Sequence, residues 1–168
     1  GVNDSPMLSA GSVNTSEDAL EVGTSVSTAS SNLLSGASDV DDVDADLVIS
    51  AINGSGANVG AAVTVSLSYT DANGIGQTQD VSLTVNSDGS YSIAAFDFDA
   101  LTEGGVASGS FTYQASDDGG ASSTIETANL TITGSNDAPT VSVSNLVINQ
   151  GQFTVLTPDT LSMIDMDS

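Results

Sequence analysis

The sequence predicts an all-β protein, an antiparallel β-sandwich of seven to eight short strands that recurs in tandem modules. Three observations support this fold class. Apolar and polar residues alternate along most of the 168 residues, turn sequences separate the alternating runs, and no stretch keeps a helical period. The abundance of Ser, Thr and Gly and the 4% of aromatic residues are also compatible with disorder. The regular alternation favours a folded sheet.

The expected strands follow one another in chain order at 47–52, 63–69, 81–85, 91–93, 111–113 and 125–132. The run 63–69 places Val63, Val65, Leu67 and Tyr69 on one face. The sequence Asp88-Gly89 predicts a tight turn between 81–85 and 91–93. A second hairpin is expected across 117–120.

A six-residue pattern occurs twice, which indicates tandem modules. Gly1-Val-Asn-Asp-Ser-Pro6 returns as Gly134-Ser-Asn-Asp-Ala-Pro139, and each copy is followed some thirty residues later by an Asp-x-Asp sequence. We therefore expect one domain over 1–135 and the linker and first strands of the next over 136–168. The chain reads as a segment of a longer polypeptide.

The charge of the chain has one sign only. It contains 22 acidic residues and no Lys, Arg or His, for a formal net charge of -22. No side chain can neutralise a carboxylate, and neither nucleic acid nor an anionic membrane surface is an expected partner, because phosphate binding depends on Lys and Arg. The countercharge must come from solution. Ca²⁺ is the natural candidate, since its ligands are carboxylate, amide and carbonyl oxygens.

The same composition excludes most enzyme chemistry. Without Cys, His or Lys the chain can form no catalytic triad, Schiff base or His-ligated metal site. A carboxylate pair such as Asp97 and Asp99 could hydrolyse a glycoside, but the chain has no Trp and few aromatic residues for sugar stacking. We expect no enzyme activity. The apolar runs are too short to insert into a membrane, and none resembles a signal peptide.

Three segments carry a family resemblance: Phe96-Asp-Phe-Asp-Ala-Leu-Thr-Glu-Gly104, Ser110-Phe-Thr-Tyr-Gln-Ala-Ser-Asp117 and Thr131-Ile-Thr-Gly-Ser-Asn-Asp-Ala-Pro139. Together they resemble the VCBS repeat and the related cadherin-like repeats of large secreted bacterial adhesins of the RTX type. The resemblance covers most of residues 1–139. It implies an extracellular, calcium-dependent, cadherin-like β-sandwich that is used many times over as a spacer. The glycine-rich RTX nonapeptide itself is absent.

In a cadherin-like sandwich alternate loops lie at opposite ends, and this arrangement sorts the candidate calcium ligands into two groups. At the entry end we expect Asn3, Asp4, Asp39, Asp41, Asp42, Asp44, Asp46, Asp117 and Asp118. At the exit end we expect Glu17, Asp18, Asp97, Asp99, Asn136 and Asp137, which would meet Asp165 and Asp167 of the following module. Carboxylates packed together without a cation repel one another and oppose folding.

Acidic residues in β-loops also have a purely structural role, because Asp commonly caps turns. We expect that role for the isolated residues Asp71, Asp80, Asp88 and Asp159, and for 97/99 and 117/118 both roles remain open. The spacing of Asp42, Asp44 and Asp46 resembles the start of an EF-hand loop. However, Leu47 and Asn53 stand where that loop needs Gly and Glu, so an EF-hand is rejected.

The expected function is that of a calcium-binding structural repeat, an extender in a bacterial surface adhesin or a matrix fibre. Its partners would be neighbouring repeats of the same polypeptide, with possible self-association in a fibre, and its location would be extracellular. The alternative is a module of the same type of protein whose calcium site binds a ligand such as a glycan.

Overall fold

The computed structural model describes residues 2–20, 26–27, 32–41, 46–96, 98, 100–137, 139–143 and 161–164. Within these ranges the regular structure is almost entirely β-strand, with very little helix, which confirms the all-β prediction. The strands are β1 (Ser12–Ser16), β2 (Val26–Ser27), β3 (Val48–Ile52), β4 (Ala62–Thr70), β5 (Gly76–Val85), β6 (Tyr91–Ile93), β7 (Val106–Ser116), β8 (Glu126–Thr133), β9 (Thr140–Val143) and β10 (Leu161–Ile164). Two short 3-10 turns, η1 (Asp18–Leu20) and η3 (Gly56–Asn58), accompany them.

The first eight strands form one curled sheet in the order β1-β8-β7-β4-β5-β6-β2, with β3 also paired to β7. β9 and β10 form a separate antiparallel pair. One pairing departs from the predicted antiparallel arrangement, because β1 runs parallel to β8, from Ser12 opposite Asn129 to Ser16 opposite Thr133. The sheet is therefore mixed.

Alternate residues of the strands point into the space that the curled sheet encloses. Leu83 of β5 lies opposite both Val63 of β4 and Ile93 of β6, so the three form one apolar row across neighbouring strands. The resulting core also contains Phe111 and Tyr113 of β7, and Leu83 and Tyr113 are at most 1% exposed. Because β1 and β3 to β8 each contribute buried residues to the same core, the polar residues of their opposite faces remain at the surface.

The predicted strands and turns are confirmed where alternation was clearest. β4 buries Val65 and Leu67 as expected, while Val63 and Tyr69 of the same face are half-buried. β5 and β7 extend beyond the runs from which they were predicted, and β8 matches its run to within one residue at each end. At the turn after β5, the Asn86 amide nitrogen donates to the Ser90 carbonyl oxygen (2.8 Å). Gly89 there has φ of 80°, a left-handed conformation that favours glycine.

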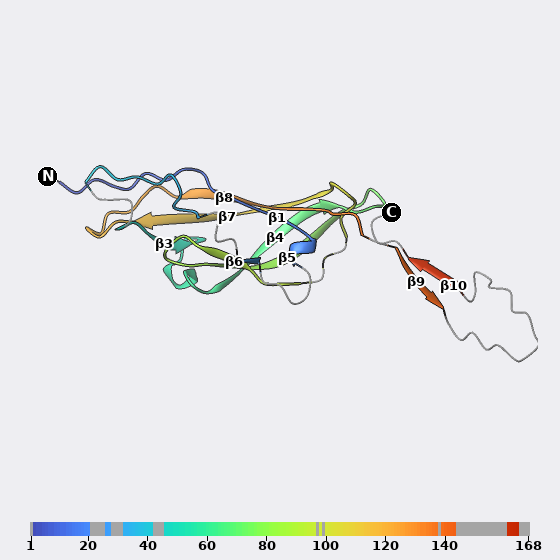
Figure 1. The fold of residues 1–168 in the computed structure, drawn as a ribbon. Coiled ribbons are helices and arrows are strands. Elements are labelled where there is room, and N and C mark those ends of the chain that lie inside the picture. The colour runs from blue at the N-terminus through green and yellow to red at the C-terminus, as the bar shows by residue number, and fades with distance from the viewer. Residues whose placement is uncertain are drawn as a thin grey trace, which may run out of the picture.

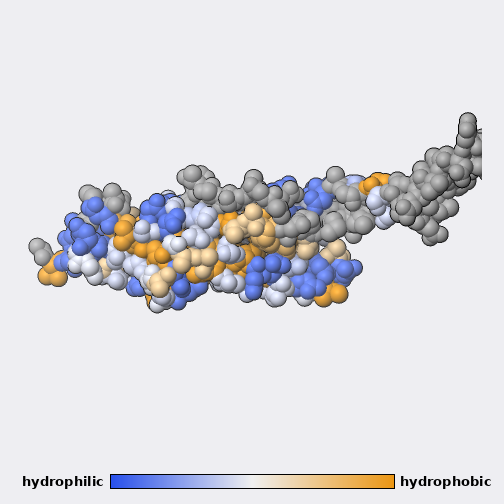
Figure 2. Space-filling model, turned by 90° about the horizontal axis from the view of Figure 1, so that it is seen from below, coloured by the Kyte–Doolittle hydropathy of each residue, from blue (hydrophilic) through white to orange (hydrophobic). Residues whose placement is uncertain are grey.

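The body is elongated, and its N-terminal segment lies at one end (Figure 1). At the other end the chain leaves β8 and continues towards β9 and β10 (Figure 1). In the view of Figure 2 hydrophilic residues gather towards both ends, while more of the hydrophobic surface lies along the middle. The two ends are therefore the places to look for polar sites.

Candidate functional site

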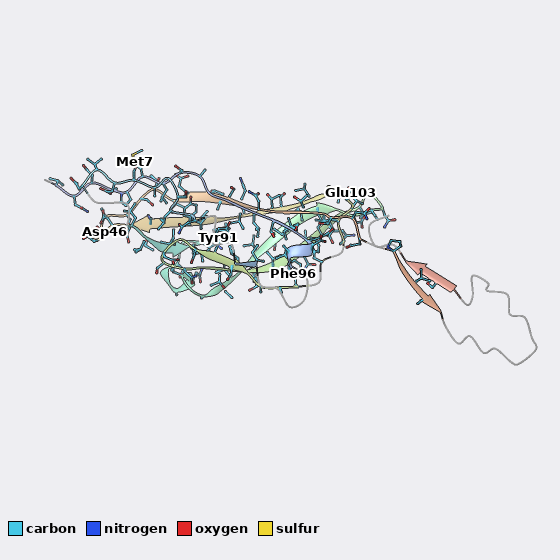
Figure 3. The ribbon with its side chains drawn as sticks, viewed as in Figure 1. Met7, Asp46, Tyr91, Phe96 and Glu103 are labelled. Carbon is cyan, nitrogen blue, oxygen red and sulfur yellow. The ribbon has the colours of Figure 1, made fainter. Side chains whose placement is uncertain are left out.

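The entry end is organised by an antiparallel bridge between the N-terminal segment and a loop distant in sequence. The Met7 amide donates to the Ser38 carbonyl oxygen (2.8 Å), and the Ser38 amide donates to the Met7 carbonyl oxygen (3.0 Å). The first acidic residues after Ser38 are thereby placed beside residues 2–6. Figure 3 shows Met7 and Asp46 towards this end and Glu103 towards the opposite one.

Three aspartates meet at this bridge. The Asp4 amide donates to Asp41 Oδ2 (2.8 Å), and the Asp41 amide donates to Asp39 Oδ1 (2.9 Å). The other oxygen of Asp39, Oδ2, is buried and has no hydrogen-bond partner within the described part of the chain. Burial without a hydrogen-bond donor disfavours the charged carboxylate. A cation bound at this oxygen would stabilise that charged form.

Asn3 links the same segment to the turn after β7. Its side-chain amide donates to Asp117 Oδ2 (3.0 Å), while Asp117 Oδ1 accepts from the Ala121 amide (2.8 Å). Asp117 is 5% exposed. At Gly119 a Cβ atom would lie 2.6 Å from Asn3 Oδ1, so any larger residue would make the Asn3 side chain shift. Asp117 thus caps its own turn and also anchors the N-terminal segment.

The structure therefore brings together five of the candidates proposed for the entry end, namely Asn3, Asp4, Asp39, Asp41 and Asp117. Asp46 and Asp118 are exposed, and within the described residues no hydrogen bond joins them to the others. Asp42 and Asp44 lie outside the described residues.

At the exit end Glu17 contacts main chain. Its side chain is 3% exposed, and Oε1 accepts a hydrogen bond from the Ser135 amide (2.6 Å) across 118 residues of sequence. The Glu17 amide donates to the Thr133 carbonyl oxygen (3.1 Å), which continues the pairing of β1 with β8. The carboxylate therefore holds the start of the segment that follows the sheet.

Gly134 fixes the same segment from the other side. Its amide donates to the Gly105 carbonyl oxygen (2.8 Å), and its carbonyl oxygen accepts from the Gly104 amide (3.0 Å). A Cβ atom there would lie 2.7 Å from Leu101 Cβ and closer still to the Thr102 carbonyl oxygen. This contact was not predicted from the sequence, although the recurrence of glycine at the start of both hexapeptides was a signal for it.

The remaining exit-end candidates are less gathered. Asp18 is exposed at the start of η1, Asn136 is exposed, and Asp137 is half-buried. The Asn136 side-chain amide donates to the Asp137 carbonyl oxygen (3.2 Å). Asp97, Asp99, Asp165 and Asp167 lie outside the residues that the structure describes.

Two isolated aspartates cap turns, as predicted. Asp71 Oδ1 accepts from the Asn73 and Ile75 amides (3.0 and 2.9 Å). The hydrogen bond from Gln77, followed by that from Ile75, lowers the pKa of Asp71. Asp88 Oδ1 accepts from the Ser90 amide and hydroxyl groups, and these bonds lower the pKa of Asp88. Asp80 accepts from the Ser66 hydroxyl group, and Asp159 lies outside the described ranges.

The donor set of the entry end suits a hard cation, because every candidate ligand is an oxygen of a carboxylate, an amide or the main chain. Among the described residues, no group of three or more acidic side chains forms a cation site by itself. In the described part of the entry end, the buried Asp39 Oδ2 without a hydrogen-bond partner is the feature that fits a bound cation directly.

No protein-family model matches the chain, and no curated protein is significantly similar to it. In the described ranges, no helix has the length and apolar character needed to cross a membrane.

Proposed function

We propose that this chain is a calcium-binding structural repeat, a sandwich-like unit that extends a bacterial surface adhesin or an extracellular matrix fibre. The observation that carries the proposal is the meeting of Asp4, Asp39 and Asp41, where the buried Asp39 Oδ2 has no hydrogen-bond partner among the described residues. The resemblance to VCBS and cadherin-like repeats supports the same function.

Electrostatics supports a cation at this end. The chain carries a formal charge of -22 and has no cationic side chain, so the approach of Asp39 and Asp41 has no internal compensation. Asp39 and Asp41, with Asn3, Asp4 and Asp117 beside them, would hold Ca²⁺. The ion would neutralise the carboxylates and bind the N-terminal segment to two loops. Asp42 and Asp44 belong to the same proposed site by sequence.

An extender is favoured over a glycan-binding module by the positions of the aromatic side chains. Sugar recognition commonly depends on exposed aromatic faces, but each aromatic residue that the structure describes is buried or half-buried. Tyr69 and Phe96, the two half-buried ones, pack against Phe98 with ring centroids 5.3 and 5.4 Å apart. These rings belong to the core.

The test is thermal unfolding in chelator, in Ca²⁺ and in Mg²⁺. At a concentration one hundred times its Kd, an ion bound only by the folded state stabilises it by about 2.7 kcal/mol per site. For a chain of this size that raises Tm by roughly 5–10 °C. We expect this rise with Ca²⁺, and a smaller one with Mg²⁺, which dehydrates reluctantly.

Asp39→Asn should reduce the rise, whereas Asp80→Asn, a matched change at an exposed strand residue, should leave it unchanged. Equal Tm values in chelator and in Ca²⁺ would refute the calcium function. Binding of the calcium-loaded chain to a glycan array would instead favour the ligand-binding alternative.

A further inference from the structure

The two copies of the repeated hexapeptide are held by different parts of the fold. In the exit copy, 134–139, the structure shows contacts from the first two residues back to the sheet that precedes them. In the entry copy, 1–6, it shows contacts from the third and fourth residues to the loops of the sheet that follows. The contacts shown for the exit copy thus come from the Gly-x part of the pattern, and those shown for the entry copy come from its Asn-Asp part.

The backward contacts involve Gly134 and Ser135. Gly134 makes two main-chain hydrogen bonds to the loop at 104–105, of 2.8 and 3.0 Å, and leaves no room for a side chain. The Ser135 amide donates to the buried carboxylate of Glu17 (2.6 Å).

The forward contacts involve Asn3 and Asp4, which correspond to Asn136 and Asp137 in the exit copy. Asn3 donates to Asp117 (3.0 Å), and the Asp4 amide donates to Asp41 (2.8 Å). The forward contacts that the structure describes come from the Asn-Asp half of the pattern.

The segment after the exit copy also begins to fold as the segment after the entry copy does. Thr140 lies 133 residues after Met7, the offset between the two hexapeptides. Met7 bridges antiparallel to Ser38, and Thr140 pairs antiparallel with Ile164. Ser38 and Ile164 each directly precede an Asp-x-Asp sequence. The partner that fits the exit end is therefore a second domain with the same arrangement of strands.

We infer that each hexapeptide is gripped from both sides, its Gly-x half by the unit behind it and its Asn-Asp half by the unit ahead. Glu17 is then a positioning residue of the joint. The first four residues of the hexapeptide would then all be held, so the orientation of one unit would fix the orientation of the next. The inference rests on the tandem repeats of the proposed function, but it needs no metal ion.

Amide hydrogen exchange of the whole chain in chelator tests both halves of the grip. We expect the Ser135 and Asp4 amides to exchange at least about tenfold more slowly than free-peptide rates. Glu17→Ala should remove the protection of Ser135, and Glu17→Gln, which keeps an acceptor oxygen, should restore part of it. Asp41→Ala should remove the protection of Asp4.

Glu103→Ala, which removes an exposed carboxylate at the exit end, is the control and should change neither amide. The core amides of Leu130 and Ile132 report whether each variant remains folded. Free-peptide exchange of Ser135 or Asp4 in the unmodified chain would overturn the inference even if Glu17→Ala fails to fold. Because the measurement is made in chelator, failure of the calcium function would leave its result unaffected.

Discussion

The phenol group of Tyr113 donates a hydrogen bond to the carbonyl oxygen of Ser9, with 2.5 Å between the two oxygen atoms. The bond joins the centre of β7 to a residue that belongs to no strand. Burial raises the pKa of Tyr113, and the nearby charge of Glu126 raises it further, so the phenol stays protonated and remains a donor at and above neutral pH. The N-terminal segment is thereby tied to the core at Ser9, between its bridge at Met7 and strand β1.

Replacing the phenol tests this connection. Tyr113→Phe keeps the ring in the core but leaves the Ser9 carbonyl oxygen without its donor, which should destabilise the fold by about 1–2 kcal/mol. Thermal or urea unfolding measures the change. Tyr69→Phe is the control, since Tyr69 contacts Phe98 through its ring. A Tyr113→Phe protein as stable as the control would contradict this role for the hydrogen bond.

A second prediction concerns the close contact between β4 and β7. At Gly109 a Cβ atom would lie 3.0 Å from Leu67 Cδ2 and closer still to the Ser66 carbonyl oxygen. Gly109→Ala should therefore destabilise the protein by about 1–3 kcal/mol through overpacking. A Cβ atom added at Gly76, in β5, would have no neighbouring atom within 4 Å, so Gly76→Ala should be neutral or slightly stabilising. Similar urea midpoints for the two variants would contradict the packing described here.

A third prediction follows from the lowered pKa of Asp71. Hydrogen bonds to the carboxylate favour its charged form in the folded state, so their contribution is present above the ordinary value of 3.8 and disappears as pH falls through the lower folded pKa. In an NMR titration the Ile75 amide signal should shift with a midpoint below 3.8. Asp71→Asn should abolish that shift. A midpoint at or above 3.8 in the unmodified chain would mean that the turn is not held by this carboxylate.

A fourth prediction concerns acid solubility. Protonation of the carboxylates below about pH 4 takes the net charge from -22 towards zero, and no Lys, Arg or His can then make it positive. Solubility should fall near pH 4 and remain low down to pH 2, because the repulsion that keeps chains apart does not return. Light scattering across this range measures the effect. Clearing of the solution at pH 2 would contradict it.

Local alternation predicted much of the fold, and long-range pairing accounts for what it missed. β4 and β8 were expected because their apolar residues alternate over many positions. β1 has one buried apolar residue, Val13, and its parallel pairing with β8 depends on residues more than a hundred positions away. Neither a strand with one buried apolar residue nor its parallel pairing with a distant strand produces a periodic pattern in the sequence.

The candidate site also has one part that the sequence predicted and one part that it could not. Clustering of aspartates in the sequence pointed to Asp39 and Asp41, which the structure places beside Asp4. The contact of Glu17 with the Ser135 amide could not be predicted from residue types, because the acceptor meets a main-chain group that any residue except proline provides.

The parallel alignment of β1 with β8 has a mechanical consequence. The chain enters at one end of the body and leaves at the other, and these two neighbouring strands connect directly to the incoming and outgoing segments. Tension between the ends pulls them lengthwise past each other, so the bonds between Ser12–Ser16 and β8 share the load in shear. An antiparallel pair pulled from one edge would open one bond at a time. This resistance to extension would suit the structural repeat proposed above.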